Sequence, residues 1–504
     1  MSQYHELAGH AKPSRVESKN DSVCNVTSIL QLKHNLDRDV KTEKQSSNMP
    51  SQSDNSETIH LLSKDSQVPK QTIKHQGQKK RKLQQFLLAF SLSTNGSRVL
   101  STDPLPSSTI QAVSGVKVLS LSWILLFHTH FLTKGSSNIS PPWTRHWSFQ
   151  IIHNAFYAVD SFFVISGLLL SYLTLKELRK RDGRLNWPMF YFHRFWRLTP
   201  AMMLVILVNT AYFQYWGSGP YWPSRSTDHD QCTRYWWLNL LYIQNFFPIK
   251  MQCLRWGWYV ACDMQFYVIS PLLIYPLYRK PWVGYVIAGA IILIQAVFRG
   301  VMSVKLDLSF NSSPNTNVFL NQVYDKPYNS VSAYVIGILT GYIMWKTERR
   351  VTIPKLCVVL GWILALGSIS SLVFGTNEFY EGHKPSKFVS ALYNSFCKTT
   401  WGLGLAWIIF ICDVGYGGFV NTFLSARLWS PLTRLTYCAY LVSPIIIIVY
   451  HLSQRYLIYN SVMNLIFLFM GFWMASYGIA FFVSLAFEVP MIGLERLLLR
   501  RNKD

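Results

Sequence analysis

The sequence predicts an all-α membrane protein, a bundle of about ten spanning helices with both termini in the cytosol. Half of the 504 residues are hydrophobic. After Ala112 the chain alternates between short polar loops and apolar stretches of roughly 17–25 residues, the length that crosses a bilayer as an α-helix. Basic residues gather in every second loop, as the positive-inside rule expects for cytosolic loops. A soluble core would show amphipathic stripes instead of repeated apolar runs.

The residues before the first span have a different composition. Residues 1–84 are polar and rich in Ser, Gln, Lys and Asn, so they are predicted to be a disordered, basic cytosolic tail. Residues 1–54 lack the apolar core of a secretory signal, so the first span is expected to direct membrane insertion. Residues 85–111 are predicted to be a juxtamembrane segment. The apolar stretch 83–92, which overlaps the start of this segment, is either a plain linker or lies among the lipid headgroups.

The membrane domain is predicted to cover residues 112–490, followed by a basic cytosolic tail at 491–504. Its spans are defined by consecutive apolar runs between loops. They are predicted at 115–132, 154–175, 196–215, 256–278, 282–298, 330–346, 353–374, 392–412, 435–452 and 462–487.

The distribution of charge sets the predicted orientation. The loop 176–197 is rich in Arg and Lys, and alternation then places further basic segments on the same, cytosolic side, at 279–280, 346–350, 427–434 and 496–503. The net charge of +23 is therefore explained by positive-inside anchoring, and no nucleic-acid partner is expected. On the opposite side, Asn138 and Asn311 lie in N-x-S/T motifs and are predicted glycosylation sites.

Two cysteines share the long loop between the third and fourth spans. Cys232 and Cys253 lie on the predicted non-cytosolic side, where an oxidising compartment allows a disulfide that closes a loop of about 20 residues. The cysteines in spans are expected to pack as small apolar residues: Cys262, Cys357, Cys397, Cys412 and Cys438. No metal-ligand spacing is present in the sequence, and no metal is expected.

Ionisable residues within spans are energetically unfavourable and therefore mark candidate sites. Lys117 and His128 lie eleven residues apart in the first span, so they share a helix face and are separated by roughly 16 Å along the axis. A cation at the cytosolic mouth with a base deeper in the membrane suits an anionic cosubstrate that enters from the cytosol. The alternative is that Lys117 snorkels to the interface and His128 bonds to a neighbouring helix.

Further polar residues could complete this site. Asp160 begins the second span and either orients His128 or interacts with its own helix dipole. Arg194 and Arg197 share a face of the third span, where they either bind phosphates or only anchor the helix. Asp263 and Gln265 in the fourth span are expected to face the bundle as acceptor-side polar residues.

From about residue 83 onward, the chain resembles the acyltransferase-3 family, and within it the nose-resistant-to-fluoxetine-like branch of animals. The large N-terminal extracellular domain of many animal members is not recognisable in residues 1–82. Six segments carry the resemblance in order and spacing: 115–130 (GVKVLSLSWILLFHTH), 159–178 (VDSFFVISGLLLSYLTLKEL), 191–203 (YFHRFWRLTPAMM), 253–275 (CLRWGWYVACDMQFYVISPLLIY), 429–444 (WSPLTRLTYCAYLVSP) and 484–499 (SLAFEVPMIGLERLLL).

The resemblance implies an integral membrane acyltransferase, with acyl-CoA as cosubstrate, no bound cofactor, and a hydroxyl on a sugar, lipid or other molecule as acceptor. The family's Arg/Lys-x10-His motif falls on Lys117 and His128, and its Arg-x-x-Arg motif falls on Arg194 and Arg197. By this likeness His128 is the general base, Asp160 is its helper, and the three cations bind the donor's phosphates. Because CoA is cytosolic, the endoplasmic reticulum membrane is the expected location.

One position departs from the family pattern. The ninth span usually contains Tyr-Leu-Val-His-Pro, but here Ser443 replaces the histidine. His451 lies near the same face, roughly 12 Å further along the helix, which makes it a poor substitute. The substitution leaves open a second function class, a non-catalytic relative that acts as a transporter or lipid-handling protein. A structural partner of another membrane protein is a third possibility.

Overall fold

The computed structural model describes residues 84, 86–103, 109–135, 142–222, 227–310, 316–380 and 382–500. The predictions for residues 1–83, for the glycosylation sites Asn138 and Asn311, and for 501–504 lie outside these residues. The described part is helical without a β-strand. Its α-helices are α3 (Leu92–Leu100), α4 (Ala112–Gly135), α5 (Gln150–His153), α6 (Phe156–Lys180), α7 (Trp187–Tyr212), α8 (Thr227–Leu240), α9 (Trp258–Ile269), α10 (Pro271–Arg279), α11 (Pro281–Lys305), α12 (Thr316–Phe319), α13 (Val331–Lys346), α14 (Lys355–Phe374), α15 (Asn377–Tyr380), α16 (Lys387–Asp413), α17 (Gly418–Leu424), α18 (Trp429–Leu452), α19 (Val462–Val483) and α20 (Val489–Arg500).

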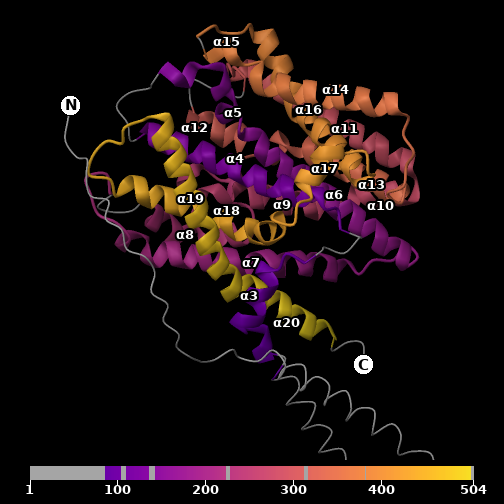
Figure 1. Ribbon diagram of the computed structural model, residues 1–504, viewed down its shortest axis with the longest axis horizontal. Coiled ribbons are helices and arrows are strands. Elements are labelled where there is room, and N and C mark those ends of the chain that lie inside the picture. Colours follow the sequence, from indigo (N-terminus) through magenta and orange to yellow (C-terminus); the bar gives the residue numbers. More distant parts are fainter. Residues whose placement is uncertain are drawn as a thin grey trace, which may run out of the picture. The chain divides into compact units, whose positions relative to one another are not determined.

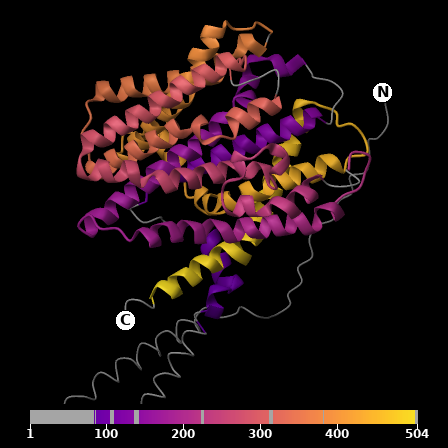
Figure 2. The same cartoon turned by 180° about the vertical axis from the view of Figure 1, so that it is seen from behind.

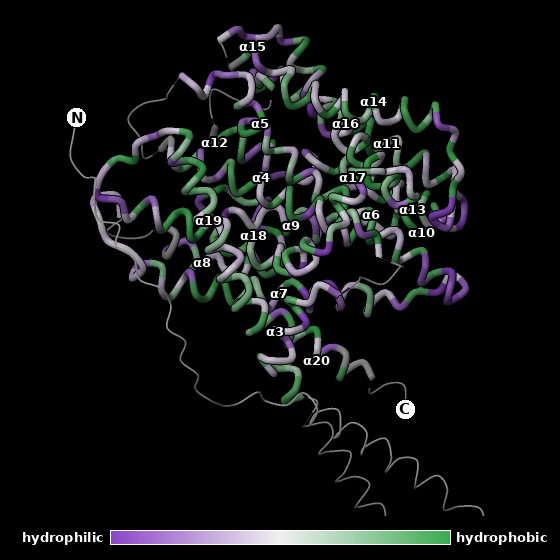
Figure 3. Tube along the Cα trace, in the orientation of Figure 1, coloured by the Kyte–Doolittle hydropathy of each residue, from purple (hydrophilic) through white to green (hydrophobic). Residues whose placement is uncertain are grey.

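The predicted all-α membrane bundle is confirmed, since nine helical segments of the described chain are long and apolar enough to cross a membrane. The sixth predicted span corresponds to the shorter apolar helix α13. Figure 3 shows the same pattern along the chain. Hydrophobic residues are concentrated in the long helices, whereas the turn between α6 and α7 is hydrophilic. A protein with this pattern buries its apolar surface in lipid as well as in its own core.

Two of the spans are interrupted. The fourth consists of the 3-10 turn Arg255–Gly257, then α9 and α10, which meet at Ser270 and Pro271. Proline has no backbone N–H to continue the helical hydrogen bonds, which explains the break. The last span contains a π-helical turn, η9 (Ser484–Glu488), between α19 and α20. Helix α20 continues to Arg500, so most of the predicted tail at 491–504 extends the last span.

Close packing of α6 against α13 forms the centre of the bundle. A Cβ at Gly337 would lie 2.1 Å from the carbonyl oxygen of Val164, and one at Gly167 would lie 2.2 Å from that of Tyr334. Small residues permit such an approach, which dispersion and polar contacts stabilise in lipid. In contrast, α14 lies at the edge of the bundle in both views (Figures 1 and 2). Only 17% of the apolar stretch of its span is buried inside the protein, compared with 67% for α6.

The helix ends on one side of the bundle are joined by ion pairs. Arg179 at the end of α6 lies 2.8 Å from Glu348 after α13. The next residue, Arg349, pairs with Asp413 at the end of α16, with its Nη2 2.6 Å from Oδ1. These contacts place the predicted cytosolic loops after the second, sixth and eighth spans on one side, as alternation requires. That this side is cytosolic stays a prediction.

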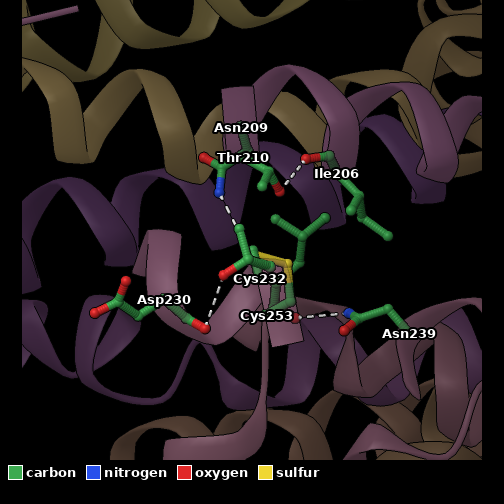
Figure 4. The surroundings of a disulfide bond; sticks show 9 residues. Ile206, Asn209, Thr210, Asp230, Cys232, Asn239 and Cys253 are labelled. Carbon is green, nitrogen blue, oxygen red and sulfur yellow. Dashed lines mark hydrogen bonds between the residues drawn. A yellow bond between two sulfur atoms is a disulfide. The ribbon is translucent and has the colours of Figure 1, made fainter. Parts of the chain in front are cut away.

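On the other side, α8 lies along α7 and carries the predicted disulfide. The bond between Cys232 and Cys253 is present (Figure 4), so this prediction is confirmed. Around it, the Asn239 amide donates to the Leu254 carbonyl oxygen at 3.3 Å. The disulfide therefore joins α8 to the chain that leads into the fourth span.

Candidate functional site

A cluster of cations is formed by side chains of α4 and α7. The Asn186 side chain caps α7 by accepting from the backbone N–H of Met189, which starts the helix so that Arg194 and Arg197 fall one turn apart. Lys117 on α4 interacts electrostatically with both arginines. The structure therefore brings together the three residues predicted to bind the donor's phosphates.

The buried carboxylate of this cluster is Asp263 on α9. It forms an ion pair with Arg194, which also donates to the Ser166 hydroxyl at 3.2 Å and stacks 4.5 Å over the Tyr267 ring. Asp263, predicted on the acceptor side, instead belongs with the cations, because a carboxylate inside the membrane needs a charged partner.

The cation cluster, defined as Lys117, Arg194, Arg197 and Asp263, carries three positive charges and one negative charge, a net charge of +2. Within the described part of the chain, neither Lys117 nor Arg197 forms an ion pair. Arg194 is held by its protein partners, so Lys117 and Arg197 are the cations of this cluster available to an anionic ligand.

His128 lies further along α4. Its Nδ1 is buried, and no hydrogen-bond partner for this atom is found among the described residues. The imidazole lies beside Phe127, with ring centroids 5.8 Å apart, and Phe127 in turn packs on Phe156 at the start of α6 at 5.2 Å. A histidine with an uncommitted ring nitrogen can accept a proton from a ligand.

The predicted pairing of Asp160 with His128 is wrong. Asp160 instead forms a buried ion pair with Lys398 on α16, with 2.5 Å between Oδ2 and Nζ. The reason is the packing of α6 on α16, in which Tyr157 stacks on Trp401 at 5.0 Å. This contact turns the face that bears Asp160 towards α16.

Sequence reasoning missed two cations that surround Asp160. Lys398 stands in the eighth predicted span, and a lone lysine in an apolar span could have been flagged. Arg299 on α11 also interacts electrostatically with Asp160 and donates to the Asn394 carbonyl oxygen at 2.5 Å. It was missed because the fifth span was predicted to end at residue 298, whereas α11 continues to Lys305.

Gln265, predicted on the acceptor side, and Ser443, a further candidate for that side, both have structural partners. Gln265 donates to the Tyr242 carbonyl oxygen at 2.7 Å and to the Asn245 side chain at 2.8 Å, which holds the loop after α8. The buried Ser443 hydroxyl donates to the carbonyl oxygen of Tyr440 in its own helix at 3.4 Å. Neither contact involves the cation cluster or His128.

Comparison with known proteins agrees with this arrangement. The family model for an acyltransferase domain, Acyl_transf_3, matches residues 110–489. Nose resistant to fluoxetine protein 6 of Caenorhabditis elegans is 32% identical over 83% of this chain and 55% of its own length. Regulator of hypoxia-inducible factor 1 of the same organism is 24% identical over 47% of this chain and 51% of its own length.

A Staphylococcus aureus protein whose name proposes an O-acetyltransferase activity is 24% identical, over 54% of this chain and 42% of its own length. The chain spans about half the length of the curated relatives it matches. No solved structure matches it. The family match covers most of the chain and includes Lys117, His128, Arg194 and Arg197, and the chain therefore belongs to the acyltransferase-3 family.

Proposed function

We propose that this protein transfers an acyl group from acyl-CoA to a hydroxyl on a sugar, lipid or other acceptor. The observation that carries the proposal is the arrangement on α4, where Lys117 in the cation cluster and His128 are eleven residues, or roughly 16 Å, apart along one helix face. An elongated donor whose phosphates bind at the cluster extends its thioester towards His128. Family membership supports this reaction class.

The cation cluster suits a polyanionic donor. Lys117 and Arg197 are not neutralised by protein carboxylates within the described residues, and the cluster has a net charge of +2. Charge-assisted hydrogen bonds from such groups to phosphate are the strong ones. Arg194, held by Asp263 and Ser166, keeps α7 aligned with α9 and α6 and sets the position of Arg197 one turn later.

His128 is the proposed general base. It takes the proton of the acceptor hydroxyl while the acceptor oxygen forms a bond to the thioester carbonyl carbon. The carbon–sulfur bond then breaks, and the sulfur takes the proton from His128, which leaves an ester and free CoA. Asp160, bound to Lys398, acts in this proposal through the electrostatic field of the site and not as the partner of the imidazole.

A second candidate is a non-catalytic relative that handles lipid or transports a substrate. Ser443, whose hydroxyl is bonded to its own helix, favours it because the family's histidine is absent. The buried charges of Asp160, Lys398 and Arg299 also fit a transport pathway. In either case we propose the endoplasmic reticulum membrane as the location, with both termini in the cytosol where CoA is present.

Acyl transfer from labelled acyl-CoA tests the proposal, in membranes that contain the wild type or His128→Ala at equal abundance. His146→Ala is the matched control, because His146 is exposed and bonds only locally with Ser148. We expect transfer in the wild type and in the control and none in His128→Ala. Acyl-CoA binding without transfer from any donor would favour the non-catalytic relative, and absence of both would refute the acyl-CoA assignment.

A further inference from the structure

Tyr324 is brought to the centre of the bundle by a segment outside all the sequence motifs. It ends the π-helical turn η7 (Leu320–Tyr324), which follows α12 in the connection between α11 and α13. The Tyr324 ring packs against Trp258 on α9 at 4.8 Å and against Phe156 on α6 at 5.6 Å. π-helical turns are rare and frequently occur at functional sites.

These contacts connect Tyr324 to the proposed base. Phe156 touches both the Tyr324 ring and Phe127, the neighbour of His128. Phe156 and Asp160 lie four residues apart on α6 and share a face. Tyr324 interacts electrostatically with Asp160, so its ring lies near the face of α6 that bears both Phe156 and the acidic residue.

The same ring also lies near the position of the missing family histidine. Tyr440 on α18 is within electrostatic range of Tyr324 and lies one turn before Ser443, whose hydroxyl bonds to the Tyr440 carbonyl oxygen. The connection between α11 and α13 therefore brings a side chain against α6 and α9, within electrostatic range of α18. The Tyr324 side chain therefore lies near the helix that carries position 443.

The Tyr324 hydroxyl is an available hydrogen-bond donor. Tyr440 donates its own hydroxyl hydrogen to the Trp256 carbonyl oxygen, and the Tyr157 hydroxyl is bonded to that of Tyr393 at 2.6 Å. No protein partner bonds to the Tyr324 hydroxyl within the described residues, and the residue is half-buried. Burial, with Asp160 and Asp325 nearby, raises the pKa of Tyr324, so the phenol keeps its proton.

We propose that Tyr324 is a catalytic residue whose phenol donates a hydrogen bond to the thioester carbonyl oxygen of the donor. This inference rests on the proposed acyl transfer. As the acceptor oxygen attacks and its proton passes to His128, negative charge develops on the carbonyl oxygen, and the phenol stabilises it. When the carbon–sulfur bond breaks, the carbonyl re-forms and CoA leaves with the proton from His128. Tyr324 begins and ends the cycle protonated.

The test compares Tyr324→Phe with Tyr328→Phe in the same connection. The first change removes the hydroxyl and keeps the ring contacts with Trp258 and Phe156. The second removes a hydroxyl that bonds to the Gln322 carbonyl oxygen and keeps a ring that packs on Phe298 at 4.5 Å, away from these aromatics. We expect kcat to fall about 10²–10³-fold in Tyr324→Phe, the usual effect of losing one such donor.

The KM for acyl-CoA and the binding of acyl-CoA are expected to stay within about twofold of the wild type in Tyr324→Phe, because the interaction forms only in the transition state. Tyr328→Phe is expected to keep wild-type kcat. Retained acyl-CoA binding shows that the Tyr324→Phe protein is folded. Wild-type kcat in Tyr324→Phe would overturn the inference, as would a loss of binding in parallel with kcat.

The His128→Ala protein separates the two proposals. If the wild type transfers acyl groups, His128→Ala does not, and Tyr324→Phe does, the inference about Tyr324 is wrong and the proposed function stands. If the wild type transfers nothing from any donor, the proposed function fails and the inference fails with it.

Discussion

Lys398 on α16 and Asp160 on α6 form an ion pair inside the membrane domain, with 2.5 Å between Nζ and Oδ2 and side chains 3% and 0% exposed. Neither residue could remain charged there alone, because an isolated charge in a low-dielectric interior is strongly unfavourable. The ion pair therefore stabilises the packing of α6 against α16, two of the spans near the proposed site.

Removing one partner of this pair is expected to destabilise the protein. Lys398→Met leaves Asp160 without its closest cation and should lower the free energy of unfolding by about 3–5 kcal/mol. Thermal unfolding in detergent measures the change. Asp160→Asn combined with Lys398→Met should recover most of the loss, since no unpaired carboxylate remains. Lys387→Met is the control, because Lys387 and Asp307 are largely exposed, and equal losses in both single variants would contradict this explanation.

Arg197 is expected to affect the binding of the donor and not the fold. Arg197→Gln removes an exposed cation of the cation cluster and should raise the Kd of acyl-CoA roughly tenfold, the loss of one charge-assisted hydrogen bond. Equilibrium binding of acyl-CoA measures it. Arg181→Gln, which removes an exposed cation paired with Glu177, should bind normally. Unchanged affinity in Arg197→Gln would exclude Arg197 from the donor site.

The stability of the protein should depend on pH through Asp325, which follows η7. Burial raises the pKa of Asp325 to about 7, against the opposing effects of Arg255 and Lys326. The folded protein then binds a proton that the unfolded chain, with a carboxyl pKa of about 3.9, has already released at intermediate pH. The contribution is therefore fully present below about pH 4 and is lost as pH rises through about 7.

Asp325→Asn separates this effect from other titrations, because the amide resembles the neutral carboxyl group. Measured by thermal unfolding at pH 5 and pH 8, the stability of the variant relative to wild type should be greater at pH 8. The neighbouring Lys326→Met change should not reproduce this gain at pH 8. A variant with the same pH dependence as the wild type would show that Asp325 does not titrate in this range.

The orientation of the protein in the membrane is tested by accessibility tags. A tag in the loop 181–186 should be reached from the cytosol, and one at residues 311–315 from the opposite side. The ion pair between Arg179 and Glu348 adds an internal check, because a tag at residues 350–353 must report the same side as the first. Equal accessibility of all three tags would refute the ten-span arrangement.

The spans could be predicted from the sequence because the bilayer imposes a local rule. Each crossing needs a continuous apolar run and satisfies its backbone within its own helix. At the sixth predicted span the structure has the shorter apolar helix α13, with 16 residues. The rule failed at the end of the fifth span, which was predicted to stop at residue 298 and so left out Arg299, whereas α11 continues to Lys305. The contacts of Arg299 with Asn329 and Asn394 allow the helix to continue past it.

The candidate functional site could be predicted in part. Lys117 and His128 belong to one helix, so helical periodicity placed them correctly on one face. The partner of Asp160 could not be derived in this way, because α6 can present Asp160 to several neighbours. Likewise, Tyr324 belongs to no periodic pattern, and nothing in its sequence context indicates that the connection after α11 returns to the bundle centre.

The sequence by itself determined the fold class, the spans, the disulfide between Cys232 and Cys253 and the family, because each depends on composition, spacing or residue identity along the chain. Only the tertiary structure decided which charges meet. Asp160 joins Lys398, Asp263 joins Arg194, and Tyr324 reaches the neighbourhood of Asp160. The physical reason is that a buried charge is paired by whichever helix packs against its face, and packing depends on the contacts of the whole bundle.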